Sequence, residues 1–547
     1  MRSIEKIAQI TLRPRSLSGV KNTTMNKRIH PVHARARVFA MLMIAGRLLT
    51  SLATAVEKPQ LQAAALEFGI TPTTGGHTSS KVGALVQDVA GPLKTTVTLL
   101  KHGELQLCLI TPHMNSPKGA NISPLIRRSV AGALNLPLSH VLLMVSHNHT
   151  DFNLVSNHIE AYSTLSMKPK EIPEPKLVPA GQDFLDQLVA TAKRLPALLQ
   201  PVTVWWAEGS EGRISYNRKG RRADGTSYLI REEDRDLLGV DFNGDIDRQA
   251  PIVVLKNARG EPVTAITQFT SHPCSCFHPE KPIVFGDWPQ VACEHVAAHL
   301  SPSRPMAVSF LQGCAGDVNS KGMFRGDVEL SKKYGRMLAD SYIKALERLQ
   351  PSSRDGLEYA VEKVRIPLAP LPSEETLKAE IAEMEDFIRR ANAGDENTLL
   401  CVGQNFPREL TPAYRGKLIE MVLPWSKWAL NLRQTGKADT VAKFLEVEIQ
   451  VFRIGDVGIV GMPFEPFQGI GRQIRAGSKM PLTIPCGYAN ISFGYLTDGP
   501  NTGDGEYQSA HYRYSKFRPP YAKPAGDVVA VKAVEILNRF AKHGTAN

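Results

Sequence analysis

Apolar β-rich runs alternate along the chain with amphipathic helical segments, and this alternation limits the fold more than any other feature. Continuous apolar runs, which are typical of buried strands, occupy residues 140–146, 250–257 and 306–312. Helical periodicity marks residues 123–136 and 332–349. Strands that alternate with helices in this way predict an α/β fold, with mixed β-sheets flanked by helices.

The stretch after residue 365 has a different composition. A Pro-rich linker leads into a charged amphipathic helix at residues 369–394, and β-rich sequence returns at residues 444–463. We therefore expect a helical insertion at about residues 366–440, inside one catalytic domain that spans residues 56–547.

Residues 1–55 are similar to a targeting segment. They hold ten Lys/Arg and one acidic residue, which accounts for nine of the twelve net positive charges of the 547-residue chain. A basic stretch that begins at Met25, apolar residues 38–46 and a small-x-small pattern at residues 53–55 follow the order of a secretory signal peptide. We expect export to the periplasm or beyond through this segment. A basic tail with a short amphipathic helix is the alternative.

Composition beyond this leader excludes several classes of protein. The remaining net charge of about +3 gives no support for nucleic-acid binding. No later stretch reaches the ~18–20 consecutive apolar residues of a membrane-spanning helix. The seven scattered cysteines are expected to be packing residues, although an exported chain leaves room for one or two disulfides.

Histidines follow two of the predicted strands. His147 and His149 come directly after the apolar run 140–146, and His272 follows the β-rich run 262–271. On an extended backbone, residues two apart face the same way, so His147 and His149 can converge on one metal ion. A pair of surface histidines in a loop is the alternative for the first motif, and a structural histidine is the alternative for the second.

Three later segments add candidate polar groups. Asp317, in a Gly-rich turn after the run 306–312, can orient a neighbour or accept a backbone N–H. Glu465 lies between a strand and a helix, where a capping acid is the plainer interpretation. Tyr495 and Tyr507 lie in a Gly-rich loop region, where tyrosines commonly only pack or form hydrogen bonds.

Taken in order, these segments resemble the neutral/alkaline non-lysosomal ceramidases and their bacterial relatives. The chain is similar to a divergent member that has the catalytic domain without the C-terminal immunoglobulin-like domain of longer members. The matching motifs span roughly residues 61–540 and read "ITP" at 70–72, "SHNHTDF" at 146–152, "SHP" at 271–273, "GDVNS" at 316–320, "MPFEPFQGIGRQIR" at 462–475 and "ISFGYLTD" at 491–498.

The resemblance implies a catalytic zinc ion, Zn²⁺, held by two histidines, one glutamate and one tyrosine. These metal ligands correspond to His147, His272, Glu465 and Tyr495. The remaining family positions imply catalytic roles near the scissile amide, with a second tyrosine that steadies the oxyanion. They correspond to His149, Arg218, Tyr507, Asp317 and Asn319.

The implied activity is zinc-dependent hydrolysis of linear amide (N-acyl) bonds through a metal-activated water. The substrate would be a small-molecule or lipid amide such as a sphingolipid, and peripheral contact with a membrane stays open. The family motif carries a serine where this chain has Asn319, so a covalent acyl-enzyme at this position is not expected. The residues Asp151 and Phe152 also replace the smaller Gly and Pro of the family motif.

Two alternatives remain from the residues themselves. A non-catalytic exported relative that only binds lipid or glycan is favoured by Asn319. A metallo-β-lactamase-like hydrolase is favoured by the H-x-H-x-D pattern of His147, His149 and Asp151, but Phe152 occupies the place of the last histidine of that signature.

Overall fold

The computed structural model describes most of the chain beyond the leader. The leader expected at residues 1–55 lies outside the described part. The described residues are 59–72, 78–79, 84–161, 164, 167–239, 241–515 and 518–543.

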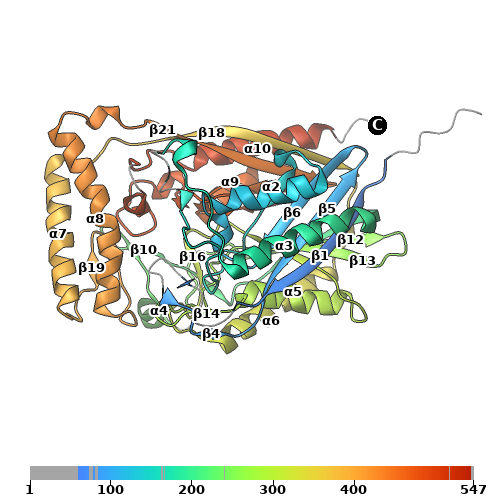
Figure 1. The fold of residues 1–547 in the computed structure, drawn as a ribbon, viewed down its shortest axis with the longest axis horizontal. Coiled ribbons are helices and arrows are strands. Elements are labelled where there is room, and N and C mark those ends of the chain that lie inside the picture. Colours follow the sequence, from blue (N-terminus) through green and yellow to red (C-terminus); the bar gives the residue numbers. More distant parts are fainter. Residues whose placement is uncertain are drawn as a thin grey trace, which may run out of the picture. The chain divides into compact units, whose positions relative to one another are not determined.

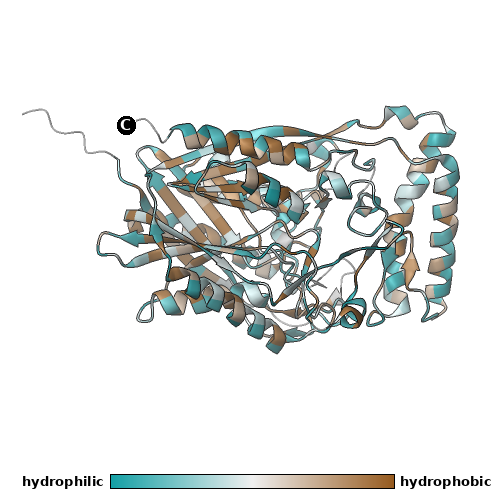
Figure 2. Ribbon diagram, turned by 180° about the vertical axis from the view of Figure 1, so that it is seen from behind, coloured by the Kyte–Doolittle hydropathy of each residue, from teal (hydrophilic) through white to brown (hydrophobic). Residues whose placement is uncertain are grey.

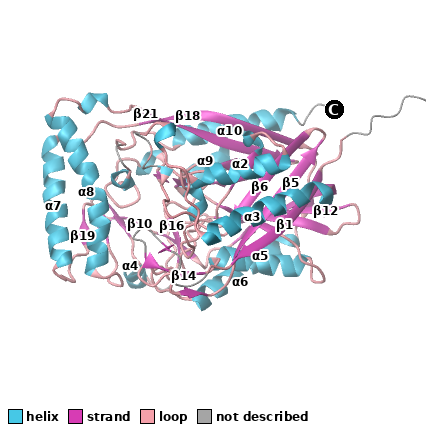
Figure 3. Ribbon diagram, viewed as in Figure 1, coloured by secondary structure: helices cyan, strands magenta, loops and turns pink. Residues whose placement is uncertain are grey.

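Two mixed β-sheets organise these residues (Figure 1, Figure 3). The larger sheet has nine strands within the described residues, in the order β15-β13-β12-β8-β1-β5-β6-β7, with β17 paired to β8. Its strands are β1 (Gln62–Ile70), β5 (Leu93–His102), β6 (Leu105–Pro112), β7 (Val141–Leu143), β8 (Gln200–Ser210), β12 (Gln249–Asn257), β13 (Pro262–Phe269), β15 (Val308–Gln312) and β17 (Gln350–Pro351). The smaller sheet has the order β18 (Leu357–Pro367), β21 (Phe444–Ile454), β22 (Val457–Gly461) and β24 (Leu482–Cys486).

Helices cover the outer face of each sheet, so the layers run helix, sheet, sheet, helix. The larger sheet packs against α2 (Ile122–Leu134), α3 (Pro179–Arg194), α5 (Asp287–Leu300) and α6 (Val328–Leu346). The smaller sheet packs against α9 (Gln468–Gly477) and α10 (Asp527–His543). The predicted α/β fold with mixed sheets is therefore confirmed, and so are the helices expected at 123–136 and 332–349.

The strands bury both faces because apolar side chains occupy successive positions. On β5, Leu99 packs against the helices and Leu100 against the other sheet. On β12, Val254 packs against the helices and Val253 against the other sheet. Successive side chains of a strand point to opposite faces, so a continuous apolar run fits a strand that lies between two layers. Figure 2 shows apolar colouring along strands of the sheets and along the helices that cover them.

A pair of long helices stands apart from the sheets, at the left of Figure 1. α7 (Glu374–Asn392) and α8 (Pro412–Gln434) pack against one another and are joined through β19 (Leu400–Cys401) and β20 (Gln404–Asn405). These helices lie inside the stretch 366–440 that the sequence predicts to be a helical insertion. We call them the α7–α8 hairpin.

Short elements complete the described part. The short elements are β2 (Thr78–Ser79), β3 (Ala84–Leu85), β4 (Asp88–Val89), β9 (Ser215–Asn217), β10 (Lys219–Arg221), β11 (Ser227–Leu229), β14 (Ile283–Val284), β16 (Val318–Ser320), β23 (Glu465–Pro466), β25 (Tyr495–Leu496) and α4 (Glu232–Leu238). Two of them, β10 and β11, form a small antiparallel hairpin beside Arg218. All seven cysteines are buried and free, in agreement with a packing role. Among the described helices, none is long and apolar enough to cross a membrane.

Candidate metal centre

The predicted site residues gather where strands of both sheets end. His147 follows β7, His272 follows β13, and Asn319 lies on the short strand β16 that comes after β15. From the smaller sheet, Glu465 follows β22 and Tyr495 follows β24. These five side chains line one cavity of about 1150 Å³.

Three imidazoles and one carboxylate converge in this cavity. The candidate ligand atoms of His147, His149 and His272 all lie within 4.8 Å of one another. Glu465 Oε2 lies 3.3 Å from Nε2 of His147 and 3.3 Å from Nε2 of His272. His149 Nε2 lies 3.2 Å from His147 Nε2. Because His147 and His272 are each only 2% exposed, these histidines are not surface residues of a loop.

The two histidines of the first motif converge in a way that differs from the sequence expectation. His147 has a φ of +62°, in the left-handed region that non-glycine residues rarely adopt. The pair is therefore not on an extended backbone. The turn at His147 brings its ring and that of His149 to a centroid distance of 4.7 Å. Backbone strain of this kind is characteristic of functional sites.

His272 is held so that one ring nitrogen faces the cavity. Its Nδ1 lies 2.7 Å from the carbonyl oxygen of Ala315, so Nδ1 carries the proton and donates to that oxygen. This leaves the lone pair on Nε2, beside Glu465. A backbone carbonyl that fixes the tautomer is the usual outer contact of a metal-binding histidine. Close approach of this turn requires glycine at position 316, because a Cβ there would lie 2.6 Å from the Glu465 carbonyl oxygen.

Glu465 and Tyr495 are paired residues of the parallel strands β23 and β25. Glu465 is not the cap of α9, which begins at Gln468. Asp317 takes that part: its carboxylate accepts the backbone N–H of Gln468 at 2.8 Å. The capping interpretation of Glu465 is therefore wrong, and the expectation that Asp317 accepts a backbone N–H is confirmed. Asp317 also accepts from the side chain of Asn217 and does not line the cavity.

Arg218 and Tyr495 form a hydrogen-bonded pair beside the imidazoles. Arg218 Nη2 donates to the Tyr495 hydroxyl at 2.8 Å and to the Gly316 carbonyl at 2.7 Å. It also lies 3.5 Å from His272 Nε2. Arg218 is only 3% exposed, so its charge is held in place by these contacts.

Lys118 belongs to the centre, although no feature of the sequence predicts it. It lies at the end of the short 3-10 helix Ser116–Lys118. Its Nζ lies 3.0 Å from His147 Nδ1 and 3.3 Å from Glu465 Oε1. Tyr488, whose ring stacks on His147 at a centroid distance of 4.3 Å, was missed for the same reason. Both residues come from segments without a histidine or carboxylate motif.

The electrostatics of the cluster favour neutral imidazoles and an ionised carboxylate. Burial lowers the pKa of all three histidines. A neighbouring basic group lowers it further in each case: Lys118 at His147, His272 at His149, and Arg218 at His272. Burial by itself would raise the pKa of the Glu465 carboxyl, but Lys118 and His147 outweigh it and hold that pKa well below its usual range. Burial raises the pKa of Tyr495 well above that of a free phenol.

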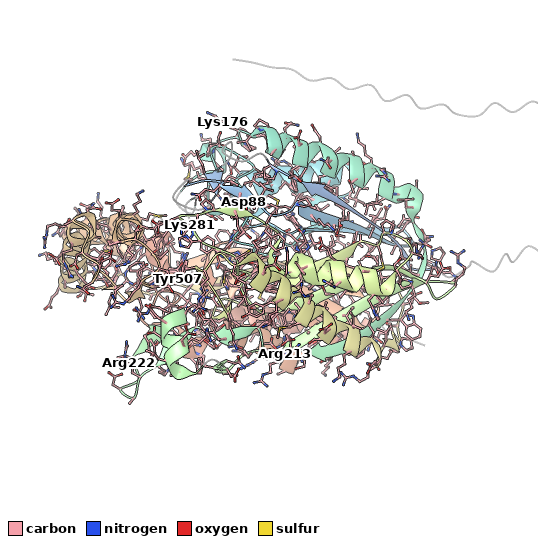
Figure 4. All side chains as sticks on the ribbon, turned by 90° about the horizontal axis from the view of Figure 1, so that it is seen from below. Asp88, Lys176, Arg213, Arg222, Lys281 and Tyr507 are labelled. Atoms are coloured by element: carbon pink, nitrogen blue, oxygen red, sulfur yellow. The ribbon has the colours of Figure 1, made fainter. Side chains whose placement is uncertain are left out.

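Tyr507 reaches the cavity from a loop that is tied to the residue next to Arg218. Figure 4 labels Tyr507 between the α7–α8 hairpin and the rest of the chain. Its ring lies 5.7 Å from that of Tyr495. The preceding residue, Glu506, is fully buried and forms a 2.9 Å ion pair with Lys219, which also pairs with Asp504 at 2.7 Å.

One wall of the cavity is apolar and belongs to the α7–α8 hairpin. The residues of α8 that line it recur every three or four positions, which places them on one face of the helix. They are Tyr414, Leu418, Met421 and Pro424. The loop before α8 adds Phe406, Pro407 and Leu410. A polar wall lies elsewhere in the cavity and includes Asn115, Asp151, Asn153, Ser156, His158 and Glu160.

Comparison with known proteins agrees with this architecture. The neutral ceramidase from Pseudomonas aeruginosa matches with a TM-score of 0.57 and 15% identity, over 90% of this chain and 76% of that chain. A ceramidase complexed with C2 matches with a TM-score of 0.60 and 15% identity, over 89% and 76% of the two chains. The chain has the neutral ceramidase fold. No protein-family model and no curated protein matches the sequence.

The ceramidase fold confirms the family resemblance at the level of architecture. It brings His147, His149, His272, Glu465 and Tyr495 together, as the order of the motifs predicts. It leaves the metallo-β-lactamase alternative without support, because Phe152, at the place of the missing histidine, is fully buried in the hydrophobic core.

Proposed function

We propose that this chain is a zinc-dependent hydrolase of linear N-acyl amides. The observation that carries the proposal is Glu465 Oε2, which lies 3.3 Å from the Nε2 atoms of both His147 and His272 in a buried cavity. Histidine nitrogen and carboxylate oxygen are donors that a catalytic zinc ion takes, with one position left open for water or substrate. In such a site zinc polarises the scissile carbonyl and lowers the pKa of a bound water.

The nitrogen and carboxylate donors suit zinc in their protonation states. Metal ligands must be deprotonated, and the depressed pKa values of the three histidines and of Glu465 satisfy this condition. His147, His272, Glu465 and Tyr495 would hold the ion. The same residues would therefore be the ligands that the family resemblance implies.

The other cavity residues would act on the substrate. His149 is neutral and lies beside the imidazole of His147, so it would transfer a proton to the leaving amine. Arg218 and Tyr507 would donate hydrogen bonds to the oxyanion, and each such donor contributes roughly 3 kcal/mol in characterised enzymes. Asn319 would contact the amide through its buried carboxamide, and Asp317 would act indirectly, because it holds Gln468 and Asn217.

The walls of the cavity favour an amphipathic substrate. The apolar wall of α8 suits an acyl chain, and the polar wall around Asp151 and Glu160 suits the amine part. Burial of an apolar chain against such a wall gains about 25 cal/mol per Å². A lipid amide, including a sphingolipid, fits this division. Export through residues 1–55, a catalytic domain over residues 56–547 and contact with a membrane surface belong to the same proposal.

The test measures zinc and amide hydrolysis on the same samples. Wild type is compared with His147→Ala and His272→Ala, using a panel of fluorogenic N-acyl substrates. About one zinc per wild-type chain, lost in both variants together with hydrolysis, is the expected result. Zinc without hydrolysis of any amide would favour the lipid- or glycan-binding alternative, which Asn319 in place of the family serine suggests. Absence of zinc from wild type would overturn the proposal.

A further inference from the structure

Lys118 shares Glu465 with the proposed metal ion. One carboxylate oxygen, Oε1, lies 3.3 Å from Lys118 Nζ, and the other, Oε2, faces the two imidazoles. Lys118 is only 4% exposed and Glu465 only 8%. The Lys118 ammonium and the Glu465 carboxylate therefore neutralise one another in a place that is largely shielded from water. A buried carboxylate that loses such a partner is strongly destabilising.

Lys118 also determines which nitrogen of His147 carries a proton. Its Nζ lies 3.0 Å from His147 Nδ1. An ammonium group can only donate, so Nδ1 accepts and a neutral His147 keeps its proton on Nε2. That Nε2–H faces Glu465 Oε2 and His149 Nε2, at 3.3 Å and 3.2 Å. Nε2 is also the atom through which His147 would bind the ion, so metal binding requires this proton to leave.

We propose that Lys118 is the internal counter-ion of the metal-free centre. It holds Glu465 and His147 in place when no metal is bound, and it weakens metal binding. The inference rests on the proposed function. An outer contact that merely orients ligands raises metal affinity about 10–100-fold. Here the contact comes from a cation that would repel a dication on the same carboxylate, and it stabilises the His147 tautomer that cannot bind through Nε2. Both effects act against the metal, so removal of the charge strengthens binding.

The experiment measures zinc affinity by chelator competition, and thermal stability with and without zinc, in wild type and Lys118→Met. Methionine keeps most of the length of the side chain without the charge. At least tenfold tighter zinc binding is expected, with a lower melting temperature of the metal-free protein and a larger rise on zinc addition than in wild type. Lys118→Gln, which keeps a neutral donor, is expected to behave likewise and covers the case in which Lys118→Met does not fold. Lys219→Met is the matched control, because Lys219 is also buried in an ion pair but does not contact the proposed ligands.

The outcomes separate this inference from the proposed function. Zinc affinity in Lys118→Met within twofold of wild type, or weaker, overturns the inference and leaves the proposed function intact. Zinc binding by the variant alone supports the inference but overturns the proposed function of the wild-type chain. Absence of zinc from wild type and both Lys118 variants overturns the inference together with the proposed function. An equal gain in affinity in Lys219→Met would also overturn it, because the effect would not be specific to the centre.

Discussion

Glu465 and Tyr495 lie directly opposite one another on the parallel strands β23 and β25. Residues paired in register on neighbouring strands point to the same face of the sheet. Two motifs that are separated in the sequence thus present a carboxylate and a phenol to one cavity. The same principle acts at His272, whose backbone pairs with that of Asn319 in a parallel bridge.

The phenol is expected to contribute less to metal binding than the imidazoles. Tyr495 is neutral in the metal-free centre, because burial raises its pKa well above that of a free phenol, and its hydroxyl accepts from Arg218. We expect Tyr495→Phe to keep one zinc per chain at about tenfold weaker affinity, whereas His272→Ala loses the metal. Chelator competition with folded variants checks this. Equal losses in both variants would contradict it.

The Lys219–Glu506 ion pair is expected to hold the loop that carries Tyr507. Its two residues adjoin Arg218 and Tyr507 in the chain, and Glu506 is fully buried. Lys219→Met leaves a buried carboxylate without its main partner, so we expect a loss of about 3–5 kcal/mol in the free energy of unfolding. In saturating zinc, hydrolysis is expected to fall through kcat with metal content unchanged.

The double variant Lys219→Met with Glu506→Gln is the control for this effect. Because it removes both charges, it is expected to recover a large part of the lost stability while Tyr507 stays poorly held. Urea denaturation and steady-state kinetics on the same samples measure both quantities. Independent, additive losses from the two substitutions would show that the pair does not act as a unit.

The sequence predicts the architecture, and candidate residues of the centre, for one physical reason. Apolar runs that are too continuous for an exposed strand must lie between layers, and polar residues that follow such runs must lie at the ends of the strands. His147, His149, His272 and Glu465 satisfy that pattern, which makes them candidates, but their convergence on one centre is implied by the family resemblance. The pairing of Glu465 with Tyr495 is not predicted, because it depends on two short strands, β23 and β25, that meet only in the folded chain.

Other parts of the centre depend on tertiary packing that leaves no local pattern. Lys118 lies in a loop whose sequence resembles any surface turn, and its role arises only because two distant ligands meet at its Nζ. The same holds for α8. It falls within the helical insertion expected at about residues 366–440, but its sequence does not reveal that Leu418 and Met421 line a cavity.

The apolar wall of α8 is expected to select among acyl chains. Leu418 and Met421 line the cavity three residues apart, on one face of the helix. Met421→Trp or Leu418→Trp adds bulk there, so we expect kcat/KM for long-chain N-acyl amides to fall at least tenfold relative to short-chain ones. Glu420→Trp is the matched control, because Glu420 is exposed on α8 and does not line the cavity. A uniform decrease for all chain lengths would contradict the expectation.

Asp317 is expected to make the stability of the fold depend on pH between about 4 and 6. Burial raises the pKa of its carboxyl from 3.8 to about 6, against hydrogen bonds from Gln468 that lower it. The folded state therefore binds the proton more tightly than the unfolded state, and stability falls as pH rises through this interval. A shift of about two pH units corresponds to roughly 3 kcal/mol, which is lost in full above pH 6.

Asp317→Asn isolates this contribution. The carbonyl oxygen of asparagine can still accept the Gln468 backbone N–H. Its amide takes the place of Oδ2, which accepts from Gln468 Nε2 and Asn217 Nδ2, so the variant also loses some stability at every pH. Other groups titrate alike in the two proteins, so the difference between their unfolding free energies at pH 4, 5, 6 and 7 reports on Asp317 alone. We expect wild type to lose stability relative to the variant as pH rises from 4 to 6, with the difference constant above that. Parallel pH profiles would show that Asp317 ionises equally well in the folded and unfolded chain.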